Sequence, residues 1–369
     1  LQYLKANHNQ LTALPERIGN MKKLKQLQIS SNEIKSLPTT FCDLNLDTKN
    51  THGFIAGNNS ICESIPPCVS NYLGFHYEFD EKGNLAYEPQ NCIDCTDEYH
   101  GISTPPGNVL NEDGNFCYKK TDLKSLQAII NSNISLKGNL PLTIGNQTWK
   151  NGRLTELALI DHQLESLPVD IGAFTGLEIL HLDKNSIRIL PKETGRMKNL
   201  QELVLDENQI DQLPEAIGKL QNLEGLSMDN NNLLSLPESF GELHNLRELY
   251  LNYNQITHLP NSFGNLTNLE ILLIYYNNLT ELPEGIGNLY NLQVLYSSNN
   301  QITTLPESIS NLSRLHKLWV SSNKLSSLPL SICELPEDCD INVSYNCLTR
   351  EYHYSCIEDA GHHLGYWCK

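Results

Sequence analysis

Leucine residues recur along this chain at a fixed interval, and the recurrence is its strongest pattern. Each 23-residue segment reads LxxLxLxxNxLxxLPxxxGxLxN, as in LQELVLDENQIDQLPEAIGKLQN from residue 200. The alternating LxL core predicts a short strand with one buried face. A repeat this short can bury that face only against its neighbours, so the strands should stack in a parallel sheet. Eight such segments begin at Leu154, Leu177, Leu200, Leu223, Leu246, Leu269, Leu292 and Leu315, and two more begin at Leu1 and Leu24.

Three other residue types recur at fixed positions, and we interpret them as structural. Pro removes an amide donor and fixes φ, so it should end the strand side and begin the opposite side. The glycines are 23 residues apart and cannot form a phosphate-binding loop. The Asn positions are Asn185, Asn208, Asn231, Asn254, Asn277, Asn300 and Asn323, with His162 in the first segment. The Pro positions run from Pro168 to Pro329, and the Gly positions run from Gly172 to Gly287 until Ser310 interrupts them.

These motifs resemble the leucine-rich-repeat family over most of the chain. The LP…G form is similar to that of Ras-associated and scribble-like scaffolds, whereas the cysteine-bearing ends resemble extracellular, plant-type repeat proteins. The resemblance implies an α/β solenoid, a horseshoe with a parallel β-sheet on the concave face and short irregular or helical segments on the convex face. It also implies that the repeated asparagines lie inside and bond to backbone groups of adjacent turns, as a buried amide must.

Composition shifts divide the chain into five segments. We expect the end of a first array with its cysteine cap at 1–72, a cysteine-containing linker at 73–120, an N-terminal cap at 121–153, eight repeats at 154–332 and a cysteine-rich cap at 333–369. The sequence FIAGNNSI should form the last strand of the first array, and Ile341 and Val343 should lie in a last strand of the second. Thr121 is a candidate N-cap for a helix that buries Leu123, Leu126, Ile129 and Ile130. Because Leu1 lies inside a repeat without an initiator Met, we expect a longer precursor.

Cysteines and glycosylation sequons point to the secretory pathway. The cysteines fall in two terminal clusters, with none in the 215 residues between Cys117 and Cys333, which fits disulfides at the ends of a solenoid. We favour pairing of Cys42 with Cys68 and of Cys333 with Cys356, and the odd number leaves at least one thiol. The cysteines are Cys42, Cys62, Cys68, Cys92, Cys95, Cys117, Cys333, Cys339, Cys347, Cys356 and Cys368. The sequons are Asn58, Asn133, Asn146, Asn265, Asn278, Asn311 and Asn342.

Charge and motifs exclude several functions. The net charge of −17, from 43 acidic and 26 basic residues, repels phosphate backbones and argues against nucleic acid. No stretch approaches the roughly 20 apolar residues of a membrane helix. No G-x-S-x-G, H-E-x-x-H, kinase or P-loop motif is present, so we expect neither catalytic residues nor an enzyme. Cys92-x-x-Cys95 lacks the second pair of a zinc finger, so we expect no metal or cofactor there.

The outward positions of the predicted sheet are the candidate binding site. Eight strands about 5 Å apart span roughly 40 Å, which suits a protein, a peptide or a glycan chain. Exposed Tyr and Trp are typical interface anchors, and six lie there: Tyr250, Tyr253, Tyr275, Tyr276, Tyr296 and Trp319. Three stacked aspartates, Asp183, Asp206 and Asp229, repel one another. A basic partner or Ca²⁺ would relieve that repulsion, although solvation and salt can do so as well.

Three hypotheses remain open from the sequence. The first is a secreted, N-glycosylated recognition protein that binds through the concave face of the second array. The second is an extracellular matrix or filament subunit that binds copies of itself, suggested by a truncated array joined to a complete one and by the odd cysteine. The third is an intracellular Ras-associated scaffold, favoured by the repeat consensus alone.

Overall fold

The computed structural model describes residues 1–30, 32–34, 37–46, 54–55, 99–101, 105–111, 117–348, 354 and 356. The chain divides into two compact units. Unit 1 comprises residues 1–130 and 138–154, and unit 2 comprises residues 131–137 and 155–369.

Unit 1 begins with a parallel three-stranded sheet, in the order β1 (Tyr3–Lys5), β2 (Gln26–Gln28) and β3 (Phe54–Ile55). The 3₁₀ helices η1 (Glu16–Asn20) and η2 (Thr39–Asp43) follow the first two strands. Leu24, Leu27, Ile29 and Phe41 lie in the core of this sheet. The strand expected in FIAGNNSI is therefore confirmed, since β3 pairs with β2 in parallel.

In the rest of the part of unit 1 that the structure describes, there are most of one α-helix and four short strands. The helix α1 (Lys120–Ser132) buries the four apolar residues that the sequence predicted. The prediction of Thr121 as N-cap is wrong, because α1 already begins at Lys120 and Thr121 lies within its first turn. The strands are β4 (Tyr99–Gly101), antiparallel to β6 (Cys117–Lys119), and β5 (Val109–Asn111), parallel to β7 (Asn146–Lys150). The short helices are η3 (Ile134–Leu136), which lies in unit 2, and η4 (Pro141–Thr143).

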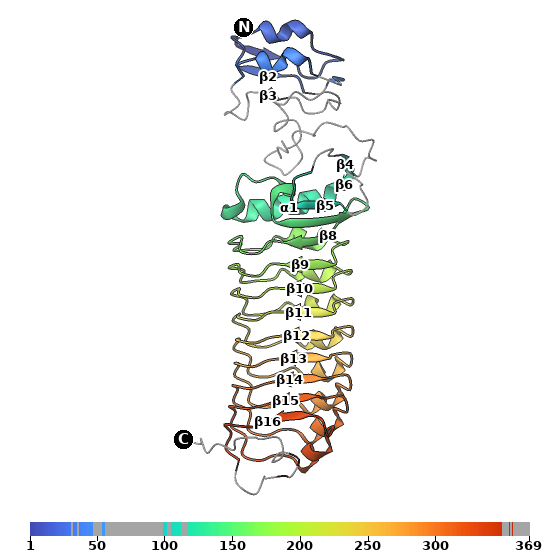
Figure 1. Cartoon of the computed structure of the whole chain (residues 1–369), viewed down its shortest axis with the longest axis vertical. Helices are drawn as coiled ribbons and strands as arrows, with labels where there is room; N and C mark the ends of the chain where they lie inside the picture. Colours follow the sequence, from blue (N-terminus) through green and yellow to red (C-terminus); the bar gives the residue numbers. More distant parts are fainter. Residues whose placement is uncertain are drawn as a thin grey trace. The chain divides into compact units, whose positions relative to one another are not determined.

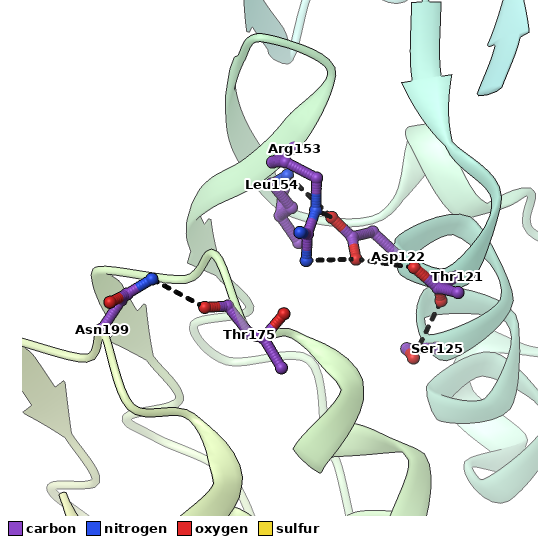
Figure 2. Close-up of polar contacts among 7 residues, drawn as sticks. All are labelled: Thr121, Asp122, Ser125, Arg153, Leu154, Thr175 and Asn199. Carbon is purple, nitrogen blue, oxygen red and sulfur yellow. Dashed lines mark hydrogen bonds and ion pairs between the residues drawn. The ribbon is translucent and has the colours of Figure 1, made fainter. Parts of the chain in front are cut away.

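Asp122 anchors α1 to the chain segment that follows β7 (Figure 2). Its buried carboxylate accepts hydrogen bonds from Arg153 Nε at 2.8 Å and from the Leu154 amide at 3.1 Å. Nearby, Tyr118 and Trp149 pack edge to face with ring centroids 4.9 Å apart. This hydrogen-bonded contact could not be predicted from the sequence, because Asp122 looks like an ordinary acidic residue in the first turn of a helix.

Unit 2 is a stack of parallel strands in constant register (Figure 1). Every pair from β9 onward joins residues 23 apart, such as Leu203 with Leu226. The middle residue of each strand is buried, which fits one face turned inward. The strands are β8 (Arg153–Ala158), β9 (Ile179–His181), β10 (Glu202–Val204), β11 (Gly225–Ser227), β12 (Glu248–Tyr250), β13 (Ile271–Leu273), β14 (Val294–Tyr296), β15 (Lys317–Trp319) and β16 (Asp340–Asn342). The last strand contains Ile341, as the sequence predicted, whereas Val343 lies one residue beyond the end of β16 and is buried.

A 3₁₀ helix on the opposite side follows each strand from β8 to β15, and the repeated Pro is its N-cap residue. The repeated Gly is buried here. A Cβ on Gly218 would collide with the carbonyl oxygen of Ser239 in the next repeat. The proline and glycine positions are thus structural, as interpreted. The helices are η5 (Val169–Ala173), η6 (Lys192–Arg196), η7 (Glu215–Lys219), η8 (Glu238–Glu242), η9 (Asn261–Asn265), η10 (Glu284–Asn288), η11 (Glu307–Asn311) and η12 (Leu330–Glu334).

The repeated asparagines form a buried ladder between turns. In a representative repeat, Asn208 Nδ2 donates to the carbonyl of Leu182 at 2.9 Å and to that of Leu205 at 3.1 Å. Its Oδ1 accepts from the amide of Ile187 at 2.9 Å. The side chain thereby satisfies backbone groups of two adjacent turns, which confirms the role implied by the resemblance. With strands on one side and 3₁₀ helices on the other, unit 2 is the expected α/β solenoid.

The structure describes six of the eleven cysteines and gives the bonding state of each. Cys333 and Cys356 form a disulfide, with their Cα atoms 5.6 Å apart, as predicted. Cys42 is also disulfide-bonded, whereas its expected partner Cys68 lies outside the described residues. Cys117 and Cys347 are bonded as well, and Cys339 is free. Four others lie outside the described residues: Cys62, Cys92, Cys95 and Cys368.

Candidate functional site

The outward side of the strands in unit 2 carries the candidate residues, and we call it the sheet face. Five of the six predicted aromatic residues meet there in two groups. Tyr253 stacks on Tyr276 at 4.7 Å between ring centroids, and Tyr275 meets them edge to face at 5.4 and 5.8 Å. We call these three residues the tyrosine cluster. Tyr296 and Trp319 stack at 4.4 Å with their planes 6° apart, and we call them the aromatic pair.

The sixth aromatic residue, Tyr250, is held by its own strand. Its hydroxyl donates to Glu248 Oε2 at 2.8 Å. Burial, together with this hydrogen bond and the Glu248 charge, raises the pKa of Tyr250 to about 12. Leu273 takes the corresponding position on β13, between Tyr250 and Tyr296. The six aromatic residues predicted for this surface are therefore divided into the tyrosine cluster, the aromatic pair and the single ring of Tyr250.

The tyrosine cluster depends on an unusual backbone position. The residue just before each repeated Asn has positive φ, and at Tyr253 and Tyr276 it is 55° and 54°. Other repeats place Asn230 and Asn299 there, a residue type that tolerates left-handed backbone. Lys184, Glu207, Ser322 and Tyr345 occupy the same position with φ between 52° and 58°, so the conformation belongs to the repeat. What distinguishes Tyr253 and Tyr276 is that their rings stack on one another at adjacent repeats. Tyr253 and Tyr276 are 46% and 48% exposed.

The three stacked aspartates are half-buried, and two of them, Asp206 and Asp229, accept hydrogen bonds from the next repeat. Asp206 Oδ1 accepts from the Asp229 amide at 2.7 Å and from Ser227 Oγ at 2.6 Å. Asp229 Oδ1 accepts from the Asn252 amide at 2.7 Å. Burial raises the pKa of both carboxyls above its ordinary value, against the opposing effect of these hydrogen bonds. Asp206 and Asp229 therefore stabilise the contact between adjacent repeats. The sequence analysis considered only the repulsion between these carboxylates and did not predict this structural role.

No metal site accompanies these carboxylates. Within the described part of the chain, no group of three His, Cys, Asp or Glu side chains is arranged to hold an ion. The calcium hypothesis for Asp183, Asp206 and Asp229 consequently has no support from their geometry. In the same part of the chain, no helix combines the length and apolar character that crossing a bilayer requires.

Sequence reasoning missed one set of outward residues. The position before the first core leucine also faces outward, because side chains alternate along a strand. Its members supply polar partners to the rings: Glu248 binds Tyr250, and Asp340 Oδ2 accepts from Trp319 Nε1 at 2.9 Å. Extending the alternation by one residue from the LxL core would have found them. The set comprises Ile179, Glu202, Gly225, Glu248, Ile271, Val294, Lys317 and Asp340.

The sequons differ in accessibility. Asn146, Asn265 and Asn311 are exposed, and Asn278 is half-buried. Asn133 is 2% exposed, its Nδ2 donates to the Ser166 carbonyl and its Oδ1 accepts from the Glu165 amide. The buried Asn133 amide leaves no space for a glycan, so the structure argues against the sequence assignment there. Asn342 lies beside Trp319 on the sheet face, and Asn58 lies outside the described residues.

Comparison with family models gives two matches in unit 2. A model described as a leucine-rich repeat region matches residues 200–278, and a model described as a leucine rich repeat matches residues 267–325. A search of the curated proteins gives no match.

Solved structures supply further similarities. The leucine-rich repeat domain of the type III effector XopL is 30% identical over 52% of this chain and 69% of its own, with a TM-score of 0.47. A leucine-rich-repeat protein of Leptospira interrogans is 25% identical over 95% of this chain and 80% of its own, with a TM-score of 0.46. The plant peptide hormone receptor RGFR1 in complex with RGF2 is 23% identical over 91% and 54%, with a TM-score of 0.49.

Proposed function

The chain belongs to the leucine-rich-repeat family, and from that premise we propose that it is a secreted, N-glycosylated recognition protein that binds a polypeptide through the sheet face of unit 2. Repeat solenoids present extended, rigid surfaces that suit macromolecular ligands. No catalytic role is proposed for this surface.

The tyrosine cluster carries the proposal. Three rings within 5.8 Å of one another, two of them on left-handed backbone, give a large rigid contact area with little conformational freedom to lose. Such aromatic groups dominate binding energy at interfaces. The aromatic pair extends the same face toward β16. Carboxylates beside both groups favour a polypeptide with basic side chains over a neutral glycan, whose binding would depend on ring stacking alone.

The secreted location is supported by separate features. The Cys333–Cys356 disulfide fits an oxidising compartment. Asn265 and Asn311 are exposed at the ends of 3₁₀ helices on the side opposite the sheet, so glycans at these two positions leave the sheet face open.

A synthetic hexapeptide library, a glycan array and soluble copies of the chain itself are the probes that test this proposal. The full chain should bind hexapeptides, and Tyr253→Asn with Tyr276→Asn should weaken binding at least tenfold. Tyr345→Asn is the matched control, since Tyr345 has the same backbone conformation (φ 54°) and is 56% exposed in the last repeat. Binding only to glycans, binding only to copies of the chain, or equal peptide binding by the double variant would each contradict the proposal.

A further inference from the structure

Among the described strands β9 to β16, β11 alone has a glycine at the outward position before the first core leucine, and a hollow opens on the sheet face there. Gly225 lies on β11 between Glu202 on β10 and Glu248 on β12. The corresponding positions on β13 to β15 carry Ile271, Val294 and Lys317, so a large side chain is usual at this position. The hollow has a volume of about 490 Å³, within the range of roughly 300–1,000 Å³ of ligand pockets.

Space above Gly225 is open. A Cβ built there would have one neighbour within 4 Å, Glu202 Cγ at 3.8 Å, which is an ordinary contact. The backbone needs no glycine at this point, unlike at the repeated Gly positions on the opposite side, where a Cβ collides with the next repeat. The absence of a side chain at Gly225 therefore creates the hollow, although the fold does not require glycine at this position.

The walls of the hollow combine apolar surface with negative charge. Ile179, Val204 and the Tyr250 ring supply the apolar part. The carboxylates of Glu202, Glu224 and Glu248 supply the charge, and no backbone amide of the described residues donates to them as amides do to Asp206 and Asp229.

The basic groups at this hollow are already engaged. Arg247 donates to Glu270 Oε1 from Nε at 2.8 Å and from Nη2 at 2.6 Å. His181 Nε2 lies 3.0 Å from Glu202 Oε1. Arg247 itself lines the hollow and its charge also acts on Glu224 and Glu248. The lining nevertheless contains four carboxylates, those of Glu202, Asp206, Glu224 and Glu248, against this single guanidinium, so an excess of negative charge remains.

We propose that the hollow at Gly225 receives the side chain of a Lys or Arg of the bound polypeptide. The inference rests on the proposed function and specifies its partner as a basic segment. The methylene stem of such a side chain would lie against Val204 and the Tyr250 ring, as long basic side chains do on apolar surface. Its charged end would meet Glu202, Glu224 and Glu248, and a cation beside an aromatic ring gains additional stabilisation. The tyrosine cluster, which begins one repeat later at Tyr253, would contact the adjoining residues of the same segment.

The test uses hexapeptide mixtures that share one fixed residue: Lys, Arg, norleucine or Glu. Norleucine matches the stem of Lys without its charge. With the full chain, mixtures with fixed Lys or Arg should bind at least tenfold more tightly than those with norleucine. Gly225→Val should abolish this preference, because it fills the hollow with the side chain that Val294 carries in the same position while retaining every carboxylate. Glu224→Gln combined with Glu248→Gln should reduce the preference several-fold with the hollow intact.

Val294→Leu is the matched control, since it adds bulk at the same strand position three repeats away and should keep the preference. Equal binding of Lys and norleucine mixtures, or a preference for Lys that survives Gly225→Val, would overturn this inference. If peptide binding is lost in the Tyr253 and Tyr276 double variant but shows no preference for Lys or Arg, the proposed peptide recognition is supported and the inference about a basic side chain is not. If no mixture binds the wild-type chain, the proposed peptide recognition fails, and the basic pocket fails with it.

Discussion

Tyr253 and Tyr276 stack face to face with ring centroids 4.7 Å apart, although both residues adopt left-handed backbone. The stack joins equivalent positions of consecutive repeats, so the solenoid period itself brings the rings into register. Neither ring is buried in the core, which makes the pair a surface feature that can be changed without opening the fold.

Replacing both tyrosines with Asn should leave the fold as stable as before. Left-handed backbone costs an L residue about 1–2 kcal/mol, and Asn tolerates it better, as at Asn230 and Asn299. That gain offsets the lost ring stacking of about 0.5–1.5 kcal/mol. We expect a free energy of unfolding within about 1 kcal/mol of wild type, measured by urea denaturation. A loss above about 2 kcal/mol would mean that the rings hold the sheet together.

Asp122→Ala should destabilise unit 1 strongly. The change leaves the Arg153 guanidinium and the Leu154 amide without their buried acceptor, which should cost about 3–5 kcal/mol. Urea denaturation followed by the fluorescence of buried Trp149 measures this, and Lys124→Ala on the exposed side of α1 is the control. Equal unfolding midpoints for the two variants would refute the anchoring role.

Two Gly→Ala substitutions should differ sharply. Gly218→Ala places a Cβ against the carbonyl of Ser239, and we expect a loss of about 1–3 kcal/mol from overpacking. Gly225→Ala, which meets only Glu202 Cγ, should be neutral or slightly stabilising. Thermal denaturation of the two variants checks the contrast. Similar melting temperatures would contradict the packing explanation for the repeated Gly.

Asp229→Asn should stabilise unit 2 at neutral pH. The pKa of Asp229 is raised by burial, so the folded state holds its proton more tightly than the unfolded state does. The cost of burying the carboxylate is therefore fully present at neutral pH and disappears as the pH falls through the folded pKa. Asn keeps the acceptor for the Asn252 amide, as Asn252 does for the Tyr275 amide at 3.0 Å. It loses the hydrogen bond that Asp229 Oδ2 accepts from Asn252 Nδ2 at 3.0 Å, which makes the gain smaller than the cost of burying the charge.

The stability advantage of Asp229→Asn over wild type should accordingly shrink as the pH is lowered from neutral toward 4, measured by urea denaturation at each pH. An advantage that grows on acidification would show that the carboxylate is stabilised in the folded state, contrary to the direction of its pKa shift.

Glycan occupancy should follow accessibility. Peptide mapping of protein secreted from a eukaryotic host should find glycans at Asn265 and Asn311, which are exposed, and at Asn278. Asn133 should be unmodified, because its amide is buried against Glu165 and Ser166. A fully occupied Asn133 together with an unmodified Asn265 would contradict the structure on this point.

The 23-residue period by itself determined the repeat architecture of this protein. A leucine at a fixed position has to be buried, a strand with one buried face has to stack, and an amide in the interior has to find partners in the next turn. The stacked strands and the change of side at each proline follow from the period. The Asn208-type ladder is what the family resemblance implied, and the Cys333–Cys356 pairing was expected from the positions of the two cysteines.

The tertiary structure alone decided what the sheet face offers to a partner. Residues side by side there are 23 positions apart in sequence, so their contacts depend on the register and direction of side chains that a single repeat does not specify. The structure divided the aromatic residues into two groups, bound Asp206 and Asp229 to neighbouring amides, and opened the hollow at Gly225. Within its own strand, Gly225 is only a weak strand former. A pocket forms there because the neighbouring strands carry the long side chains of Glu202 and Glu248 on either side.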